Sequence, residues 1–320
     1  MIGLKSNLAY GRDADGTVAE EAAAIVLALP EAKDNCTLPS LVSYLAYEAR
    51  MVDSLPFMFL REGANDTEND QGLLEHVRCL AVAGRILVAR VRWLDEMIDG
   101  REPLGPPSEV HRLSRAVYAK ALDYFASSLS GEHDAADFFR LLAGLEARYA
   151  TSLAIDAASC DLPSGGRAPA SVDLESYAEQ AKARAMLASA SVEAQMIVTM
   201  ASEKKKQCAR NCLESLAVAW QLGDDVLDLD EDYRDGRFSW IVSETLRNIP
   251  EKDRALGSNA FYEVALLGGH VQAALEHSLA FYREAERAAG DLFPAAKSCV
   301  RCEIRKTTEL LAELTTIVSL

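Results

Sequence analysis

The sequence has few of the residues that β-rich proteins use in their turns and strands. Among its 320 residues there are only 18 glycines and 10 prolines, and aromatic residues account for 7%. Few stretches alternate apolar and polar residues in the two-residue period of a strand, whereas the helical period is common. Because alanine, leucine, glutamate and arginine are abundant, the composition favours helix over sheet.

Positive charge and long apolar runs are also scarce. The formal net charge of −16 argues against nucleic acid or an anionic membrane as a partner. No stretch approaches the roughly eighteen apolar residues of a membrane span, and the first residues show no signal-peptide pattern, so a cytoplasmic location is expected. A metal cation, or a substrate that carries one, suits the negative charge better.

The seven cysteines form an odd and unmatched set. Cys208 and Cys212 are four residues apart, and Cys299 and Cys302 are three apart. Either spacing resembles a pair of thiolate ligands, but it also places both residues on one helix face. We therefore expect reduced cysteines that pack in the core rather than a metal site.

Apolar residues recur with the helical period along most of the chain. The predicted helices cover residues 18–29, 38–60, 70–99, 108–130, 134–158, 172–201, 203–232, 258–288 and 291–317. The segment 100–108 (GREPLGPPS) ends a helix at Asp99, and residues 160–171 and 233–240 mark further breaks. Since no internal repeat or compositional boundary is present, the sequence predicts one all-α domain over residues 1–320, a bundle of about ten helices.

The densest run of acids lies in residues 220–237, WQLGDDVLDLDEDYRDGR. If residues 221–232 are helical, their spacing places one set of polar residues on a common face: Gln221, Asp224, Asp225, Asp228 and Asp232. Leu222, Val226 and Leu229 fall on another face and can pack in the core. Like charges one turn apart destabilise a helix by about 0.2–0.5 kcal/mol per pair, so a bound cation is expected to offset them. Mg²⁺ prefers such hard oxygen ligands together with substrate phosphates.

A second cluster with the same spacing lies about 130 residues upstream. It repeats the arrangement of an anchor, two adjacent acids and a third acid one turn later: Arg92, Asp95, Glu96 and Asp99. Both clusters stand near the ends of predicted helices, where the mouth of a site can form. Either cluster alone fits a solvated acidic face equally well, but the matched pair favours a site for metal ions and a diphosphate.

A calcium-binding loop is excluded for the segment 228–239 (DLDEDYRDGRFS). Its acids at the first, third and fifth positions fit such a loop. However, Tyr233 stands at the sixth position, which requires glycine, and Ser239 stands at the twelfth, which requires glutamate.

At these residues the chain resembles the class I isoprenoid synthases, an all-α superfamily whose helices surround a central cavity and which ionises allylic diphosphates. Residues 95–99 (DEMID) resemble the first aspartate-rich motif of the superfamily, DDxxD, with Glu96 replacing one aspartate. Residues 221–228 (QLGDDVLD), followed by Asp232 and Arg237, resemble the second motif of the trans-prenyl synthases.

The same region also resembles squalene and phytoene synthases, whose second motif has the pattern QL…DxxED…GR. Residues 221–222, 228–232 and 236–237 match this pattern, and residues 92–99 fit the first motif of these enzymes. The chain departs from chain-elongating synthases because it has no N-terminal GGKR-type segment and only Arg101 after the first motif. The N-D-x-x-S-x-x-x-E motif of bacterial terpene cyclases is absent too. The sequence thus resembles the prenyl-synthase plan without its site for the acceptor, isopentenyl diphosphate.

The resemblance implies a site that holds three Mg²⁺ ions and a prenyl diphosphate. The implied metal ligands are Asp95, Glu96, Asp99, Asp224, Asp225 and Asp228, of which Asp95, Asp99 and Asp224 are expected to be essential for catalysis. The residues expected to contact the diphosphate are Arg92, Lys182, Gln221, Asp232 and Arg237. Lys182 matches the diphosphate-binding lysine of the family, although Ala183 follows it in place of the usual threonine.

The sequence therefore predicts a terpene synthase that ionises farnesyl or geranylgeranyl diphosphate with Mg²⁺ and releases pyrophosphate with a terpene product. The missing acceptor segments favour this activity over its alternatives. One alternative is a prenyltransferase, acting by head-to-head condensation or by short-chain elongation. Another is a non-catalytic helical regulatory subunit. A homodimer is expected from the resemblance alone.

Overall fold

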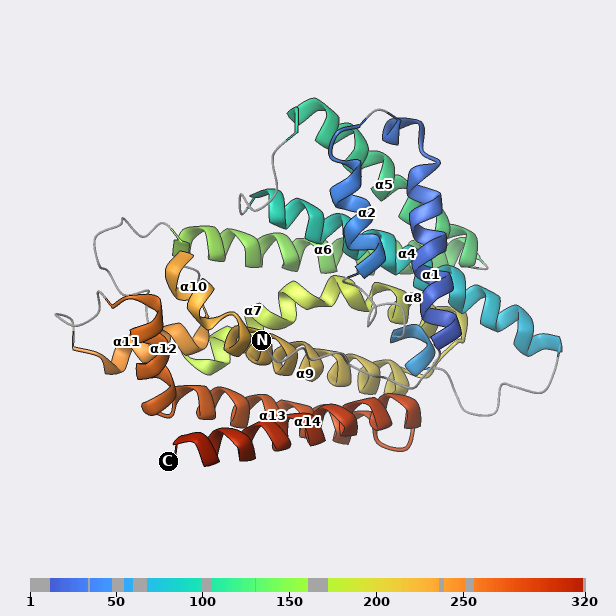
Figure 1. Cartoon of the computed structure of the whole chain (residues 1–320). Helices are drawn as coiled ribbons and strands as arrows, with labels where there is room; N and C mark the ends of the chain where they lie inside the picture. Colours follow the sequence, from blue (N-terminus) through green and yellow to red (C-terminus); the bar gives the residue numbers. More distant parts are fainter. Residues whose placement is uncertain are drawn as a thin grey trace. The chain divides into compact units, whose positions relative to one another are not determined.

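The structure is a computed structural model that describes residues 12–33, 35–47, 55–59, 68–98, 105–129, 131–160, 172–235, 239–250 and 256–318. Every regular element within these ranges is helical, so the predicted all-α class is confirmed (Figure 1). None of the helices described is long and apolar enough to cross a membrane.

The described residues form a series of α-helices, named in chain order. They are α1 (Arg12–Leu27), α2 (Leu38–Tyr47), α4 (Glu68–Ile98), α5 (Pro107–Ser128), α6 (Glu132–Cys160), α7 (Leu174–Ala185), α8 (Ala190–Val198), α9 (Glu203–Leu227), α10 (Leu229–Asp235), α11 (Trp240–Asn248), α12 (Ser258–Leu267), α13 (His270–Ala289) and α14 (Pro294–Val318). Two short 3₁₀ turns, η1 (Pro30–Ala32) and η2 (Met186–Ser189), complete the described elements.

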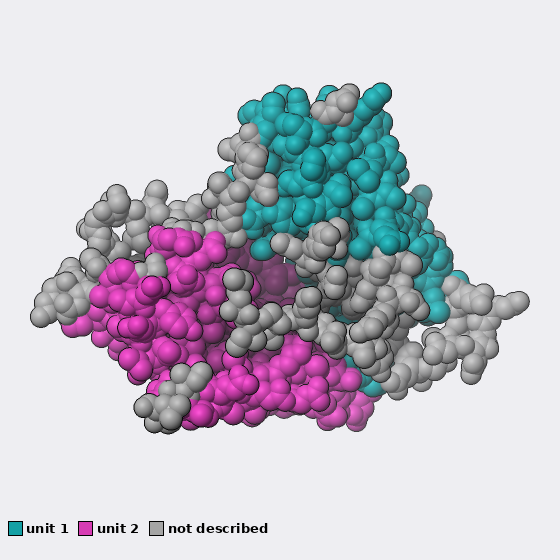
Figure 2. Space-filling model, in the orientation of Figure 1, with its two compact units in different colours: residues 1–142, 187–207, 292–296 teal, residues 143–186, 208–291, 297–320 magenta. Residues whose placement is uncertain are grey.

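The chain divides into two compact units, each assembled from separated stretches of sequence (Figure 2). Unit 1 comprises residues 1–142, 187–207 and 292–296, and unit 2 comprises residues 143–186, 208–291 and 297–320. The prediction of a single domain over residues 1–320 stays a prediction.

Unit 1 is built around the long helix α4, which packs against α1, α2, α5 and α8. Residues 80–87 of α4 are buried on every side, because helices surround this stretch and leave it no solvent-facing stripe. Even Arg85 is fully buried, and its Nε donates a 2.9 Å hydrogen bond to the carbonyl oxygen of Leu45 near the end of α2. A buried guanidinium needs such acceptors, so Arg85 ties α2 to α4.

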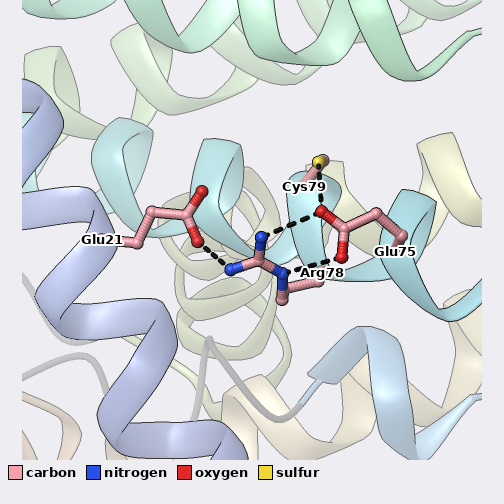
Figure 3. Close-up of polar contacts among 4 residues, drawn as sticks. All are labelled: Glu21, Glu75, Arg78 and Cys79. Atoms are coloured by element: carbon pink, nitrogen blue, oxygen red, sulfur yellow. Dashed lines mark hydrogen bonds and ion pairs between the residues drawn. The ribbon is translucent and has the colours of Figure 1, made fainter.

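A polar clamp joins α1 to α4 in the same unit (Figure 3). The guanidinium of Arg78 lies between two carboxylates, donating to Glu21 on α1 and, at 3.0 and 2.9 Å, to Glu75 one turn earlier on α4. This hydrogen bonding lowers the pKa of Glu75. The thiol of Cys79 lies 4.0 Å from Glu75, and burial, with the nearby negative charge, raises the pKa of Cys79. The clamp therefore joins α1 to α4, and the Cys79 thiol beside it is uncharged at neutral pH.

Unit 2 packs α9 to α13 around one apolar cluster that also includes residues of α7. Its fully buried members include Val218, Leu222, Leu229, Ile241 and Phe261. The ring of Tyr233 on α10 stacks on Phe261 of α12 with centroids 3.8 Å apart, and its hydroxyl donates to the carbonyl oxygen of Leu256 at 3.0 Å. These contacts fix the short helix α10, which carries part of the second acidic cluster.

Helix α14 runs beside α13 (Figure 1), and an ion pair between Arg301 and Glu286 at 2.6 Å joins them. Each predicted cysteine pair has one buried member, Cys212 on α9 and Cys299 on α14, whereas Cys208 and Cys302 are partly exposed. Burial raises the pKa of Cys212 to about 12 and that of Cys299 to about 11, so both thiols stay protonated at neutral pH. The prediction of reduced core cysteines is confirmed for these two residues.

Three long predicted helices are each divided into two in the structure, so the described residues form more α-helices than the about ten predicted. The predicted helix 172–201 is interrupted by η2, and 203–232 is interrupted at Asp228. The helix predicted over 258–288 breaks at Gly269, whose φ of 77° lies in the left-handed region that glycine adopts without strain. Helix spacing alone does not reveal such breaks, because the apolar period continues across them.

Helix α2 covers Leu38–Tyr47 of the predicted helix 38–60, and residues 55–58 are helical too, whereas residues 48–54 and 60 lie outside the described residues. Helix α11 was not predicted at all. Its start carries a recognisable signal, because the Ser239 hydroxyl accepts a hydrogen bond from the backbone N–H of Val242 at 3.3 Å, as an N-cap does.

Candidate functional site

The first acidic cluster lies in the last turns of α4, in unit 1. Asp95 is partly exposed and Glu96 is buried. Arg92 stands one turn before Glu96, and its Nη2 atom lies 3.7 Å from Glu96 Oε1. Asp99 lies outside the described residues. The structure therefore brings together Arg92 and Glu96, and leaves Asp95 as the more accessible acid.

Helix geometry explains why the two adjacent acids differ. Successive residues of an α-helix project about 100° apart, so Asp95 and Glu96 cannot point the same way. Trp93 and Met97 bury their side chains and fix the inner face of this turn. Glu96 stands three residues after Trp93, on the same side of the helix, and is buried, whereas Asp95 is partly exposed.

The second acidic cluster lies in unit 2, where α9 ends and α10 begins. Asp228 stands between the two helices, so the prediction of an unbroken helix over 221–232 is wrong at this residue. Backbone hydrogen bonds nevertheless continue across it, from Asp228 N to Asp224 O at 2.9 Å and from Asp232 N to Asp228 O at 2.8 Å. The predicted helical spacing of the acids is therefore largely preserved.

The apolar side of this segment agrees with the prediction. Leu222 and Leu229 are fully buried in the core of unit 2, and Val226 packs against the same core. The polar side is less uniform than predicted. Asp224 is exposed and Asp228 is partly exposed, whereas Asp225 and Asp232 are buried. The five polar residues thus do not share one equally accessible face, because adjacent positions again diverge by about 100°.

Asp225 is held by two hydrogen bonds from neighbouring side chains. Tyr177 on α7 donates its hydroxyl to Asp225 Oδ2 at 2.7 Å, and Gln221 donates its amide Nε2 to Asp225 Oδ1 at 2.9 Å. The predicted contact of Gln221 with the diphosphate stays a prediction. Tyr177 was not among the predicted site residues, because nothing in the sequence indicates a contact across 48 positions.

The acids of the second cluster raise one another's pKa values. Burial raises the pKa of Asp225 to about 7, although the hydrogen bonds from Gln221 and Tyr177 oppose the shift. Burial also raises the pKa of Asp232 to about 8, with further contributions from the charges of Asp225, Asp228 and Asp224. Desolvation and like charge both disfavour the ionised forms, so a cation bound nearby would be stabilised.

The basic residues of α7 have different surroundings. Lys182 pairs with Glu179 one turn earlier, with Nζ 2.7 Å from Oε1. The positive charge of Arg184 instead acts on the network, since it opposes the burial-driven rise in the pKa of both Asp225 and Tyr177. Arg184 was not among the predicted site residues. The signal was present, because seven residues, or two helical turns, separate it from Tyr177.

Arg237, predicted to contact the diphosphate, lies outside the described residues.

The described residues limit how a metal ion could be held. Within the part of the chain that the structure describes, no three acid, histidine or cysteine side chains could hold a metal ion by themselves. Mg²⁺ usually takes one or two carboxylates and completes its shell with water and substrate phosphates. Asp224 and Asp228, one turn apart with exposed surface, fit such a site.

Sequence comparison finds no matching protein-family model and no matching curated protein. Comparison with solved structures finds close architectural similarity. Geranylgeranyl pyrophosphate synthetase from Pyrococcus horikoshii gives a TM-score of 0.70 at 16% identity, covering 90% of this chain and 94% of that one. Polyprenyl synthase from Caulobacter crescentus, complexed with calcium and isoprenyl diphosphate, gives 0.68 at 17% identity, covering 90% and 93%. Octaprenyl pyrophosphate synthase from Helicobacter pylori gives 0.69 at 14% identity, covering 92% and 99%.

The chain has the isoprenoid synthase fold. This confirms the fold predicted from the two acidic motifs. The solved structures named above with the isoprenoid synthase fold are prenyl diphosphate synthases, so they support the alternative prediction of a prenyltransferase better than the main prediction of a terpene synthase. At identities of 14–17% the similarity establishes the isoprenoid synthase fold and not the reaction.

Proposed function

We propose that this protein is a Mg²⁺-dependent prenyltransferase that ionises an allylic prenyl diphosphate and joins the prenyl group to a second substrate. The observation that carries the proposal is the second acidic cluster on an isoprenoid synthase fold. Asp224 and Asp228 are accessible there, and a buried network supports them. The solved structures with the same fold are named as prenyl diphosphate synthases, which favours chain elongation among prenyltransferase reactions.

The reaction requires heterolytic cleavage of a carbon–oxygen bond. The electron pair leaves with the pyrophosphate, and an allylic cation remains. When bound, Mg²⁺ supplies Lewis acidity that neutralises the leaving group. In unit 2, Asp224 and Asp228 would hold metal. Asp95 and Asp99 stay predicted metal ligands of the first cluster. Three ions per site stay a prediction.

Basic side chains would bind the phosphate oxygens and keep the leaving group from returning to the cation. We assign this role to Arg184 first, because its charge already acts on the second cluster. Lys182 would have to leave Glu179 to take part, and Arg237 and Arg92 stay predicted contacts. Arginine suits the role because its planar guanidinium can donate two hydrogen bonds to one phosphate.

In elongation the cation is attacked by the double bond of isopentenyl diphosphate, and a proton is then lost from the new carbon chain. The released pyrophosphate carries the negative charge to accept that proton. Bond formation and proton loss thus restore neutrality at carbon and lengthen the diphosphate by one isoprene unit.

A terpene synthase is the second candidate function, because the sequence lacks the GGKR-type segment and the paired arginines by which elongating synthases bind isopentenyl diphosphate. In that reaction the cation closes on itself or captures water, and the product keeps the carbon number of the substrate. Head-to-head condensation and a non-catalytic role are the remaining predictions.

One set of incubations separates these functions. Purified protein with Mg²⁺ is given geranyl, farnesyl or geranylgeranyl diphosphate singly, with and without isopentenyl diphosphate, and products are separated by chromatography and mass spectrometry. A diphosphate one isoprene unit longer supports elongation. A hydrocarbon or alcohol of unchanged carbon number, formed without the acceptor, identifies a terpene synthase. A doubled hydrocarbon with NADPH identifies head-to-head condensation.

The controls for these incubations come from the same segment of chain. Asp224→Ala should abolish any true product, whereas Asp230→Ala should leave it unchanged, since Asp230 is an exposed acid on α10 with no proposed role. Inertness of the wild type with every diphosphate would favour the non-catalytic subunit. A homodimer stays a separate prediction, which size-exclusion chromatography with light scattering would test.

A further inference from the structure

We propose that Asp225 is a positioning residue rather than a metal ligand, and that Tyr177 holds it so that Asp224 and Asp228 are presented to Mg²⁺ in a fixed direction. The inference deepens the proposed function and rests on it. It concerns only residues of unit 2: Tyr177 on α7, and Gln221, Asp224, Asp225 and Asp228 at the end of α9.

The first step is the occupancy of the Asp225 carboxylate. Each of its oxygens accepts one hydrogen bond, from Tyr177 at 2.7 Å and from Gln221 at 2.9 Å. The residue is only 4% exposed, whereas Asp224 beside it is exposed. A carboxylate oxygen has a second lone pair, but burial leaves a hydrated ion little access to it. The accessible acids of the cluster are therefore Asp224, one position before Asp225, and Asp228, three positions after it.

The second step concerns the donor. Tyr177 is 5% exposed, and a buried hydroxyl without a partner is costly, so its bond to Asp225 is strongly favoured. The hydrogen bond joins α7 to α9, and the two bonded residues are 48 positions apart in the chain.

The third step is the place of this link on α9. The helix ends at Leu227, two residues after Asp225, and helix ends fray unless something holds them. Leu222 and Leu229 anchor the apolar side, and Tyr177 anchors the polar side through Asp225. With both sides fixed, Asp224 and Asp228 can approach a metal without first ordering the turn that carries them.

The test measures binding of Mg²⁺ with inorganic pyrophosphate by isothermal titration calorimetry, without any turnover. Residues that orient metal ligands typically change affinity by about 10–100-fold when altered. We expect Tyr177→Phe and Asp225→Asn to weaken binding by about tenfold each with an unchanged number of ions bound, and Asp224→Asn to weaken it by more than about 100-fold. The double variant Tyr177→Phe with Asp225→Asn should be no weaker than either single variant, because both changes break one link.

A matched variant separates positioning from a general loss of stability. Tyr282→Phe also removes a buried tyrosine hydroxyl from unit 2, but on α13 and away from the cluster. We expect it to lower the unfolding temperature of the metal-free protein without changing the affinity for Mg²⁺ and pyrophosphate. A loss of affinity in Tyr282→Phe equal to that in Tyr177→Phe would overturn the positioning role.

The remaining outcomes are distinguishable. In one outcome Asp225→Asn lowers the affinity for Mg²⁺ and pyrophosphate as much as Asp224→Asn does and loses a bound ion, while Tyr177→Phe keeps the wild-type affinity. Asp225 is then a metal ligand and the proposal is wrong. If the wild type binds no Mg²⁺ with pyrophosphate, the proposed function and this inference fall together. Binding by the wild type with loss in the Asp225 variant alone would leave the proposed function standing and remove only the inference.

Discussion

The two acidic clusters repeat one local design, yet they are held in different ways. In each, two adjacent acids occupy a helix end, the first is the more accessible, and the second is buried. Glu96 faces Arg92 of its own helix at 3.7 Å, and that arginine side chain is 52% exposed. Asp225 is bonded by Tyr177 from another helix at 2.7 Å. Glu96 of the first cluster thus pairs with a half-exposed residue of its own helix. Asp225 of the second cluster is bonded by a buried residue of another helix.

This difference shows that equal spacing in sequence does not imply equal roles. Helical spacing alone sets which acid of a pair turns inward. What meets the inward acid depends on the neighbouring helix, and for Asp225 helix α7 brings the uncharged hydroxyl of Tyr177. The second cluster should therefore be the more rigid of the two and the more sensitive to change at a distant residue.

The largest expected effect is loss of the accessible acids. Asp95→Ala and Asp224→Ala should each lower kcat/KM for the active prenyl diphosphate by about 10³-fold, since a metal ion contributes several kcal/mol to stabilising the leaving group and each 1.4 kcal/mol is tenfold. Steady-state kinetics at fixed Mg²⁺ would measure this, with Asp230→Ala as the control. Retention of activity in Asp95→Ala alone would show that the first cluster is a solvated acidic face.

The comparison of the inward acids predicts unequal effects on stability. Tyr177→Phe leaves a buried carboxylate oxygen without its donor and should lower the free energy of unfolding by about 1–3 kcal/mol. Arg92→Ala breaks a half-exposed ion pair and should change it by less than about 1 kcal/mol. Urea titration followed by circular dichroism would measure both. Equal losses would mean that the link from α7 is no stronger than the local one.

The two basic residues of α7 offer a sharper contrast within unit 2. Arg184→Ala should weaken pyrophosphate binding in the presence of Mg²⁺ by about tenfold or more, because a hydrogen bond to a charged group contributes about 1.5–3 kcal/mol. Lys182→Ala should have a smaller effect, since Lys182 is paired with Glu179. Calorimetry on the two variants decides the order. A larger loss in Lys182→Ala would restore the assignment made from the sequence motif.

The smallest expected effect is a pH dependence of the metal-free protein. The pKa values of Asp225 and Asp232 are raised to about 7 and about 8 by burial, above the value of about 3.9 in an unfolded chain. The folded state therefore binds more protons between these limits, and stability falls as pH rises from about 4 to about 8. Thermal unfolding in EDTA should show this slope, and Asp225→Asn should reduce it. A slope of opposite sign would show that the network is ionised without metal.

Much of the site could be predicted from the sequence because it depends on interactions within one helix. Spacing of three and four residues placed Leu222 and Leu229 on the buried face of the second cluster, and the break at residues 100–108 placed the first cluster at a helix end. The same spacing did not predict which acids are accessible. It grouped Asp224 with Asp225 on one face, although their directions differ by a quarter turn or more.

Composition and helical period by themselves determined the all-α class, and the resemblance of the two acidic motifs to class I isoprenoid synthases implied the isoprenoid synthase fold. Only the tertiary structure decided that Tyr177 on α7 bonds Asp225 on α9 and that Asp225 and Asp232 are buried. The physical reason is the range of the interactions. A helix period reports which side of a helix is apolar, whereas the partner of a buried polar group is set by how distant helices pack, and that packing leaves no periodic trace in the sequence.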